Sequence, residues 1–159
     1  MRNIIIVLWV ILVTFFAAPI VANFVSGVPA EEIPEVIQKE AETDQLEITG
    51  AEEEGNKAMY TFNAGKDFGV AVFVHYADNY SYDEGAMANG EKYIDVSLDT
   101  GWDVYQYKVT RGGPELVGVM AMSGSYRMYI ILAAVLAVIT IGGAIFSRIK
   151  KNKPEKTHR

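Results

Sequence analysis

The chain of 159 residues contains no cysteine, which excludes disulfides, a thiolate nucleophile and a zinc–thiolate site. Without disulfides, a domain of this size must be stabilised by its core, together with any membrane anchor. Such a composition is more typical of bacterial and archaeal exported proteins than of animal secreted ones. Histidine is also scarce, since His75 is the only one before the C-terminal tail. We expect His75 to be structural, and the sequence predicts no metal ion and no cofactor.

Basic residues are few in the middle of the chain. Residues 28–127 hold seven Lys and Arg against nineteen Asp and Glu, a net charge of −12, whereas the tail after Phe146 carries +5. A strongly acidic segment repels nucleic acid, so nucleic acid is excluded as a partner. Acid in the middle and base at both ends is the pattern of a chain that crosses a membrane.

Charge is missing altogether from residues 128–146. As a helix this stretch would span roughly 28 Å of a hydrocarbon core about 30 Å thick. We therefore predict a transmembrane helix over residues 126–147 and, by the positive-inside rule, a cytoplasmic tail over residues 148–159. The residues expected at the two membrane interfaces are Tyr126, Arg127, Tyr129, Arg148, Lys150 and Lys151.

The first 27 residues form a second apolar segment, in which Arg2 precedes an apolar run that continues to Val25. This pattern fits a signal anchor or a cleaved signal peptide. Because Val25, Ser26 and Gly27 are a poor cleavage site, we favour the uncleaved anchor, and the signal peptide stays the alternative. Either reading places residues 28–125 outside the cytoplasm, attached to the plasma membrane.

The exported segment has the pattern of a small α+β domain. Ile33, Val36, Ile37 and Ala41 recur at helical spacing and predict a helix from Pro34 to about residue 42. Segments of alternating or β-branched residues, separated by Gly, Asn and Asp turns, then predict five or six strands. These strands are residues 58–62, 70–76, 92–98, 104–110 and 116–122, with 45–49 as a further candidate. Short connections favour one antiparallel sheet with the helix packed on it.

One triplet raises the question of catalysis. Asp99, Thr100 and Gly101 repeat the letters that carry the catalytic carboxylate of aspartic proteases, and Leu98 before them also fits. In size the exported segment resembles a retroviral-type protease subunit. That family places Ser or Ala where this chain has Trp102, and it puts the triplet early, whereas under thirty residues remain here before residue 126. We therefore expect a hairpin turn, with an aspartic-type protease at Asp99 as the remote alternative.

Residues 77–90 mix tyrosines, acids and small polar residues, a composition found both in solvated connecting loops and in protein-binding loops. The candidate partner-contact loop comprises Asp78, Asn79, Tyr80, Tyr82, Asp83 and Glu84. The acids lack the spacing of a helix–loop–helix calcium site. We expect a non-catalytic, membrane-tethered extracytoplasmic module that binds or regulates another membrane or extracytoplasmic protein. The alternative is an extracytoplasmic sensor of a small ligand or cation.

Overall fold

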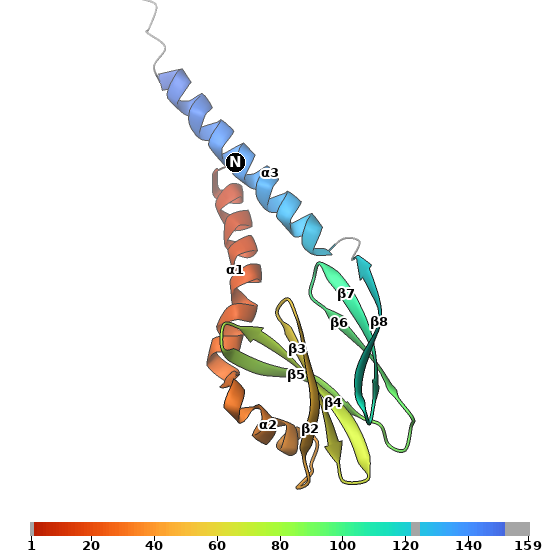
Figure 1. Cartoon of the computed structure of the whole chain (residues 1–159). Helices are drawn as coiled ribbons and strands as arrows, with labels where there is room; N and C mark the ends of the chain where they lie inside the picture. Colours follow the sequence, from red (N-terminus) through yellow and green to blue (C-terminus); the bar gives the residue numbers. More distant parts are fainter. Residues whose placement is uncertain (1, 122–124, 152–159) are drawn as a thin grey trace, which may run out of the picture. The chain divides into compact units, whose positions relative to one another are not determined.

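The structure is a computed structural model that describes residues 2–121 and 125–151, with side chains described from residue 6 to 121 and from 129 to 145 (Figure 1). The chain divides into two compact units. One contains Met1–Phe16 and Gly124–Arg159, and the other is Ala17–Ser123.

The elements follow one another in an order close to the predicted one. They are α1 (Arg2–Ser26), β1 (Val28–Pro29), η1 (Ala30–Glu32), α2 (Ile33–Glu40), β2 (Glu47–Glu54), β3 (Lys57–Ala64), β4 (Asp67–Tyr76), β5 (Asn79–Met87), β6 (Ile94–Asp99), β7 (Asp103–Thr110), β8 (Gly113–Ala121) and α3 (Ser125–Lys151). The α+β class is confirmed, and every strand predicted from the sequence is present.

The strands form two antiparallel sheets instead of the single sheet predicted. The first sheet has five strands in the order β1-β5-β4-β3-β2, and the second has three in the order β6-β7-β8. The chain crosses from one sheet to the other between Met87 and Ile94, where Asn89 and Gly90 have φ angles of +50° and +87°. Asn89 and Gly90 thus form one of the expected Gly, Asn and Asp turns, but this turn connects two sheets.

Helix α2 covers one face of the five-stranded sheet. Pro34 lies in its first turn, where the missing N–H costs no hydrogen bond. The predicted apolar stripe is confirmed, because Ile33 and Ile37 are each 1% exposed and pack with Phe62 and Phe73 of the sheet. This contact forms the first of two hydrophobic cores.

The second core lies between the two sheets. Met59, Val70 and Val72 of the five-stranded sheet pack there against Leu98 and Val109 of the three-stranded sheet. Strand β4 thus has Val70 and Val72 in one core and Ala71 and Phe73 in the other. The domain is a three-layer arrangement of helix, sheet and sheet, with β4 buried on both faces.

Close packing around β4 requires glycine at position 69. A Cβ atom on Gly69 would lie 2.6 Å from Cζ of Phe62, 2.7 Å from Sδ of Met87 and 2.8 Å from the carbonyl oxygen of Ala86. Since real Cβ atoms essentially never come so close, only glycine lets Phe62 and Met87 close over the sheet.

The other unit pairs the first half of α1 with α3. The indole N–H of Trp9 donates to Oγ1 of Thr140 at 3.2 Å, and Phe15 stacks on Tyr129 with ring centroids 4.3 Å apart. Leu12 and Leu136 are buried there, although most of the described apolar side chains of the two helices are exposed. Exposed apolar faces of this extent suit lipid better than water.

Within the described residues, one helix is long and apolar enough to cross a membrane. This segment, Ile6–Ser26, has 21 residues and a mean hydropathy of 2.3. The predicted second transmembrane helix is not supported, because the described apolar stretch of α3, Tyr129–Ile145, has 17 residues, against about 20 for a typical span.

Candidate functional site

The residues predicted to form a contact loop lie on a strand, except Asp78, which precedes it. Asn79–Met87 is β5, which pairs with β4 along its whole length, so the loop prediction was wrong. The segment is polar because β1 covers only its first two residues, through the pairs Val28–Tyr80 and Pro29–Asn79. Beyond Ser81 the outer edge of β5 has no paired strand within the described residues.

The turn before β5 consists of Ala77 and Asp78, with Ala77 at a φ angle of +53°. Asp78 is exposed, and its carboxylate contributes to the raised pKa of Tyr80, after burial and Glu53. The Tyr80 hydroxyl donates to Glu53 at 3.3 Å, and its ring stacks on His75 with centroids 5.1 Å apart. Tyr80 is therefore engaged within the domain.

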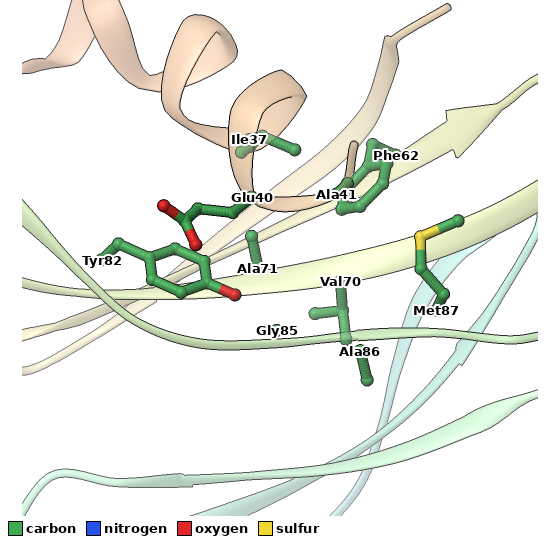
Figure 2. Close-up of a pocket in the computed structure, with 10 residues that line it drawn as sticks. All are labelled: Ile37, Glu40, Ala41, Phe62, Val70, Ala71, Tyr82, Gly85, Ala86 and Met87. Atoms are coloured by element: carbon green, nitrogen blue, oxygen red, sulfur yellow. The ribbon is translucent and has the colours of Figure 1, made fainter. Parts of the chain in front are cut away.

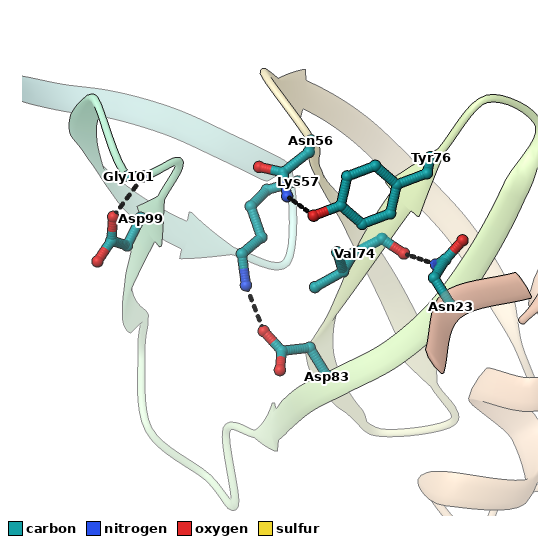
Figure 3. Close-up of polar contacts among 8 residues, drawn as sticks. All are labelled: Asn23, Asn56, Lys57, Val74, Tyr76, Asp83, Asp99 and Gly101. Carbon is teal, nitrogen blue, oxygen red and sulfur yellow. Dashed lines mark hydrogen bonds and ion pairs between the residues drawn. The ribbon is translucent and has the colours of Figure 1, made fainter. Parts of the chain in front are cut away.

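Asn79 faces the end of α1. Its side-chain amide donates to the backbone carbonyl of Asn23, and the amide of Asn23 donates to the carbonyl oxygen of Val74 at 2.8 Å and to Ser81 at 3.1 Å. Figure 3 shows the bond from Asn23 to Val74. Asn23 is only 2% exposed. The last turns of α1 are thus fastened to β4 and β5, although the sequence analysis set the domain boundary after residue 27.

Tyr82 closes a small cavity between α2 and β5. The cavity has a volume of about 80 Å³ and is lined by Ile37, Glu40, Tyr82, Gly85 and Met87, among others (Figure 2). The Tyr82 ring meets Phe73 edge-on at 5.7 Å, and a Cβ on Gly85 would lie 2.6 Å from the Tyr82 hydroxyl. Burial, followed by the charges of Glu40 and Glu84, raises the pKa of Tyr82.

Asp83 forms the single ion pair among the described residues, with Nζ of Lys57 2.5 Å from its Oδ2 (Figure 3). It is also the extra residue of a β-bulge, because Val72 pairs with Glu84 while Phe73 pairs with Tyr82. Bulges bend a strand and increase its twist. The free edge of β5 is therefore irregular at its middle.

A larger groove lies on the open side of the two-sheet sandwich. It has a volume of about 190 Å³ and lies between residues 84–86 of β5 and residues 94–97 of β6, with Val70 and Val72 also in its lining. Glu84 and Asp95 are exposed at the groove, and neither forms an ion pair in the part of the chain that the structure describes. The groove is thus apolar between two acidic margins.

The Asp99 triplet forms the connection between β6 and β7. Oδ1 of Asp99 accepts a hydrogen bond from the backbone N–H of Gly101 at 2.7 Å (Figure 3), and Gly101 has a φ angle of +82°. Oγ1 of Thr100 donates to the carbonyl oxygen of Asp103 at 3.0 Å. The predicted turn is therefore confirmed, and one oxygen of the Asp99 carboxylate holds it in shape.

His75 lies at the rim of the sheet, half-buried at the end of β4 and stacked on Tyr80. Its Nε2 atom is buried without a hydrogen-bond partner. Among the described residues, three or more His, Asp or Glu side chains do not come together in a group that could hold a metal ion. The stacking contact is consistent with the structural role expected for His75.

A tyrosine–carboxylate pair links the two sheets, and no sequence motif marks its two residues. The hydroxyl of Tyr107 on β7 donates to Oε1 of Glu54 on β2 at 3.2 Å. Tyr107 is 4% exposed, and burial together with the Glu54 carboxylate raises its pKa to about 12. The neighbouring Tyr105 also has a raised pKa, from burial and from the same carboxylate.

Of the predicted membrane-interface residues, Tyr129 is described and packs against Phe15. The side chains of the others lie outside the described residues: Tyr126, Arg127, Arg148, Lys150 and Lys151. Their interfacial role stays a prediction.

Comparison with protein-family models, with curated proteins and with solved structures finds no match for this chain.

Proposed function

We propose that the chain is a membrane-tethered extracytoplasmic module without catalytic activity, which binds a protein partner at the open side of its two-sheet sandwich. The observation that carries the proposal is the groove between β5 and β6, where two strand edges flank apolar side chains of the inter-sheet core. Exposed strand edges beside an apolar groove are recurring recognition surfaces in proteins.

The tether is α1, which is kept in the mature protein. Cleavage after Gly27 would remove Asn23 and leave the carbonyl of Val74 and the amide of Asn79 without the partners they have here. Leaving such groups unsatisfied costs about 1 to 3 kcal/mol each when they are buried. The domain is therefore more stable with the anchor attached than without it.

Helix α3 completes a two-helix anchor with its basic end in the cytoplasm. Support comes from the charge-free residues 128–146 and from the bond between Trp9 and Thr140, which gives the indole N–H of Trp9 an acceptor in lipid. A cysteine introduced at Glu53 should react with an impermeant reagent in intact cells, whereas one at Lys156 should not. The reverse pattern would refute this topology.

Partner binding is tested by photo-crosslinking in intact membranes. A photoreactive residue at Ser97, in the groove, should capture a protein, and one at the exposed Asp44, away from the groove, should not. The proposal would be refuted if no protein were captured either from Ser97 or from any further position over the domain surface.

A small-ligand sensor is the second candidate, favoured by the cavity beneath Tyr82. A hydrogen-bonding hydroxyl and a carboxylate beside apolar side chains are what a small polar–apolar molecule requires. This function predicts that a compound from a small-molecule panel raises the melting temperature of the full chain in detergent and that Gly85→Val, whose side chain would displace the Tyr82 hydroxyl, abolishes the shift. A panel without any shift would exclude it.

A further inference from the structure

The two strand edges at the groove differ in their ability to accept another strand. The edge of β5 is covered by β1 at its start and interrupted by the bulge at Asp83. Strand β6 pairs with β7 without any register shift from Ile94 to Asp99, and its other edge has no partner strand in the described ranges. A regular edge presents evenly spaced N–H and C=O groups for pairing, whereas a bulge removes that regularity. The edge open to pairing is therefore β6.

The two faces of β6 define the side chains that a paired strand would carry. Leu98 is fully buried and Ile94 and Val96 are half-buried on the inner face, while Asp95, Ser97 and Asp99 are exposed on the outer face. Because side chains on neighbouring strands share a face, alternate residues of an added strand would lie beside Ile94 and Val96, towards the groove. The remaining residues would lie beside Asp95 and Asp99.

The groove has room for apolar side chains. Its volume of about 190 Å³ exceeds the roughly 150 Å³ of an apolar cavity that holds benzene. A leucine- or valine-sized side chain would contact Val70 and Val72 there and would be removed from water. The inner positions of an added strand are therefore apolar.

Charge determines the outer positions. Asp95 and Asp99 on β6 and Glu84 across the groove are all acidic, within a segment of net charge −12. Opposite charges on adjacent strands attract and like charges repel. A second copy of β6 would bring Asp95 and Asp99 against acids of the same kind, so self-pairing is disfavoured and a basic segment is favoured.

We propose that the partner docks by adding an extended segment, with apolar residues alternating with lysine or arginine, as a fourth strand next to β6. This inference rests on the proposed function and specifies its partner at the same groove. Backbone pairing along β6 aligns the segment, apolar side chains enter the groove, and the basic side chains face Asp95 and Asp99. The acidic charge also speeds the encounter with a basic partner and makes the association salt-dependent.

The test uses the full chain in detergent micelles and a peptide of alternating valine and lysine, six residues long like β6. Two matched peptides replace lysine by glutamate or carry N-methyl groups on alternate backbone amides. We expect the valine–lysine peptide to bind and both matched peptides to bind at least about tenfold more weakly. Equal binding of all three peptides would overturn the proposal, as would no binding of the valine–lysine peptide.

Reversing charges distinguishes the contribution of the acidic residues at the groove from that of the net charge of the domain. The double variant Glu84→Lys/Asp95→Lys should weaken binding of the valine–lysine peptide about tenfold. The control Glu31→Lys/Asp44→Lys changes the net charge equally at exposed positions away from the groove. It should retain binding within about twofold at moderate salt. Equal losses in the two variants would show nonspecific attraction and refute the site.

The substitution Ser97→Pro tests backbone pairing along β6 without changing any charge. Proline removes the backbone N–H of residue 97, so a hydrogen bond is lost either to the added peptide or to β7. A lower melting temperature would show that the lost bond belonged to the β6–β7 ladder. If Ser97→Pro folds with an unchanged melting temperature and still binds the peptide fully, strand addition along β6 is refuted. If it melts earlier, N-methylation of the peptide remains the deciding measurement.

The crosslinking experiment keeps this inference separate from the proposed function. A protein captured at Ser97 together with a valine–lysine peptide that does not bind would leave the proposed function standing and reject the strand-addition mode. Capture of a second copy of this chain would reject the basic partner.

Discussion

The side-chain amide of Asn23, near the end of the first helix, donates to the backbone carbonyl of Val74 at 2.8 Å, and Asn23 is 2% exposed. Replacing Asn23 by Leu removes this donor and the bond to Ser81. We expect a loss of about 1 to 3 kcal/mol in the free energy of unfolding. Thermal and urea unfolding of the full chain in detergent measure the loss.

Ser26→Ala is the matched control for Asn23→Leu. The Ser26 hydroxyl is exposed, donates to the carbonyl of Ala22 within its own helix and makes only a long contact of 3.4 Å with the hydroxyl of Ser81, so its removal should change stability by no more than about 0.5 kcal/mol. Equal stability of Asn23→Leu and Ser26→Ala would mean that α1 does not contribute to the domain.

The pair between Tyr107 and Glu54 predicts a loss of stability in alkali. Below pH 10 the phenol is protonated in both folded and unfolded chains, and between pH 10 and about 12 the unfolded chain loses its proton first. Unfolding is therefore favoured as the pH rises through this window, by on the order of 2 kcal/mol. In Tyr107→Phe this part of the pH dependence should disappear, as measured by denaturant unfolding across the window. A pH dependence identical to that of the unchanged chain would contradict the assignment.

Gly69 should not tolerate a methyl group. Gly69→Ala places a Cβ within 2.8 Å of Phe62, Met87 and the backbone of Ala86, and we expect a loss of about 1 to 3 kcal/mol from overpacking. Gly112→Ala is the control, because the nearest atom to its Cβ is Oγ1 of Thr110 at 3.7 Å. The two variants should differ by several degrees in melting temperature. Similar values would show that the core around β4 is looser than described.

Two substitutions of Asp99 distinguish a structural role in the turn from a catalytic role. Asp99→Asn keeps an oxygen acceptor for the N–H of Gly101 and should change stability by less than about 0.5 kcal/mol, whereas Asp99→Ala should cost about 1 kcal/mol. We also expect Asp99→Asn to keep full biological activity in cells. Loss of activity in a stable Asp99→Asn protein would point to catalysis by the carboxylate instead.

Local patterns were sufficient to predict the elements of this fold. The stripe of Ile33 and Ile37 predicted α2, and the alternation of Ile94, Val96 and Leu98 predicted β6, because each segment buries one face. Glycines at positions that adopt positive φ angles, Gly65 and Gly101 among them, marked hairpin turns. These features depend only on residues near one another in the sequence.

The division into two sheets was harder to predict. The uninterrupted apolar run from Val70 to Val74 indicates a strand buried on both faces. This apolar run was visible in the sequence, but one helix packed on a single sheet buries only one face of the strand. Which strands supply the second layer depends on tertiary packing around Leu98 and Val109, and no local pattern specifies it.

The error at β5 has a related cause. The segment Asp83-Glu84-Gly85 contains none of the β-branched or aromatic residues that are typical of strands. Its composition therefore predicts a loop. They lie on a strand because Glu84 and Gly85 pair with β4 on one side while Asp83 bulges between paired residues, and the other side is open. For the same reason the groove could not be predicted, since it arises where two edges from different sheets come close.

The two sheets are each continuous in the chain: β1 to β5 follow α1, and β6 to β8 lead to α3. The two terminal helices are therefore connected along the chain to different layers. Residues 88–93 are the covalent connection between those layers. Val72 of the first layer and Leu98 of the second belong to the core between the layers, and Val72 also lines the groove. The width of the groove therefore depends on how closely the two layers pack, so a substitution that changes the volume of the core between them would change the groove as well.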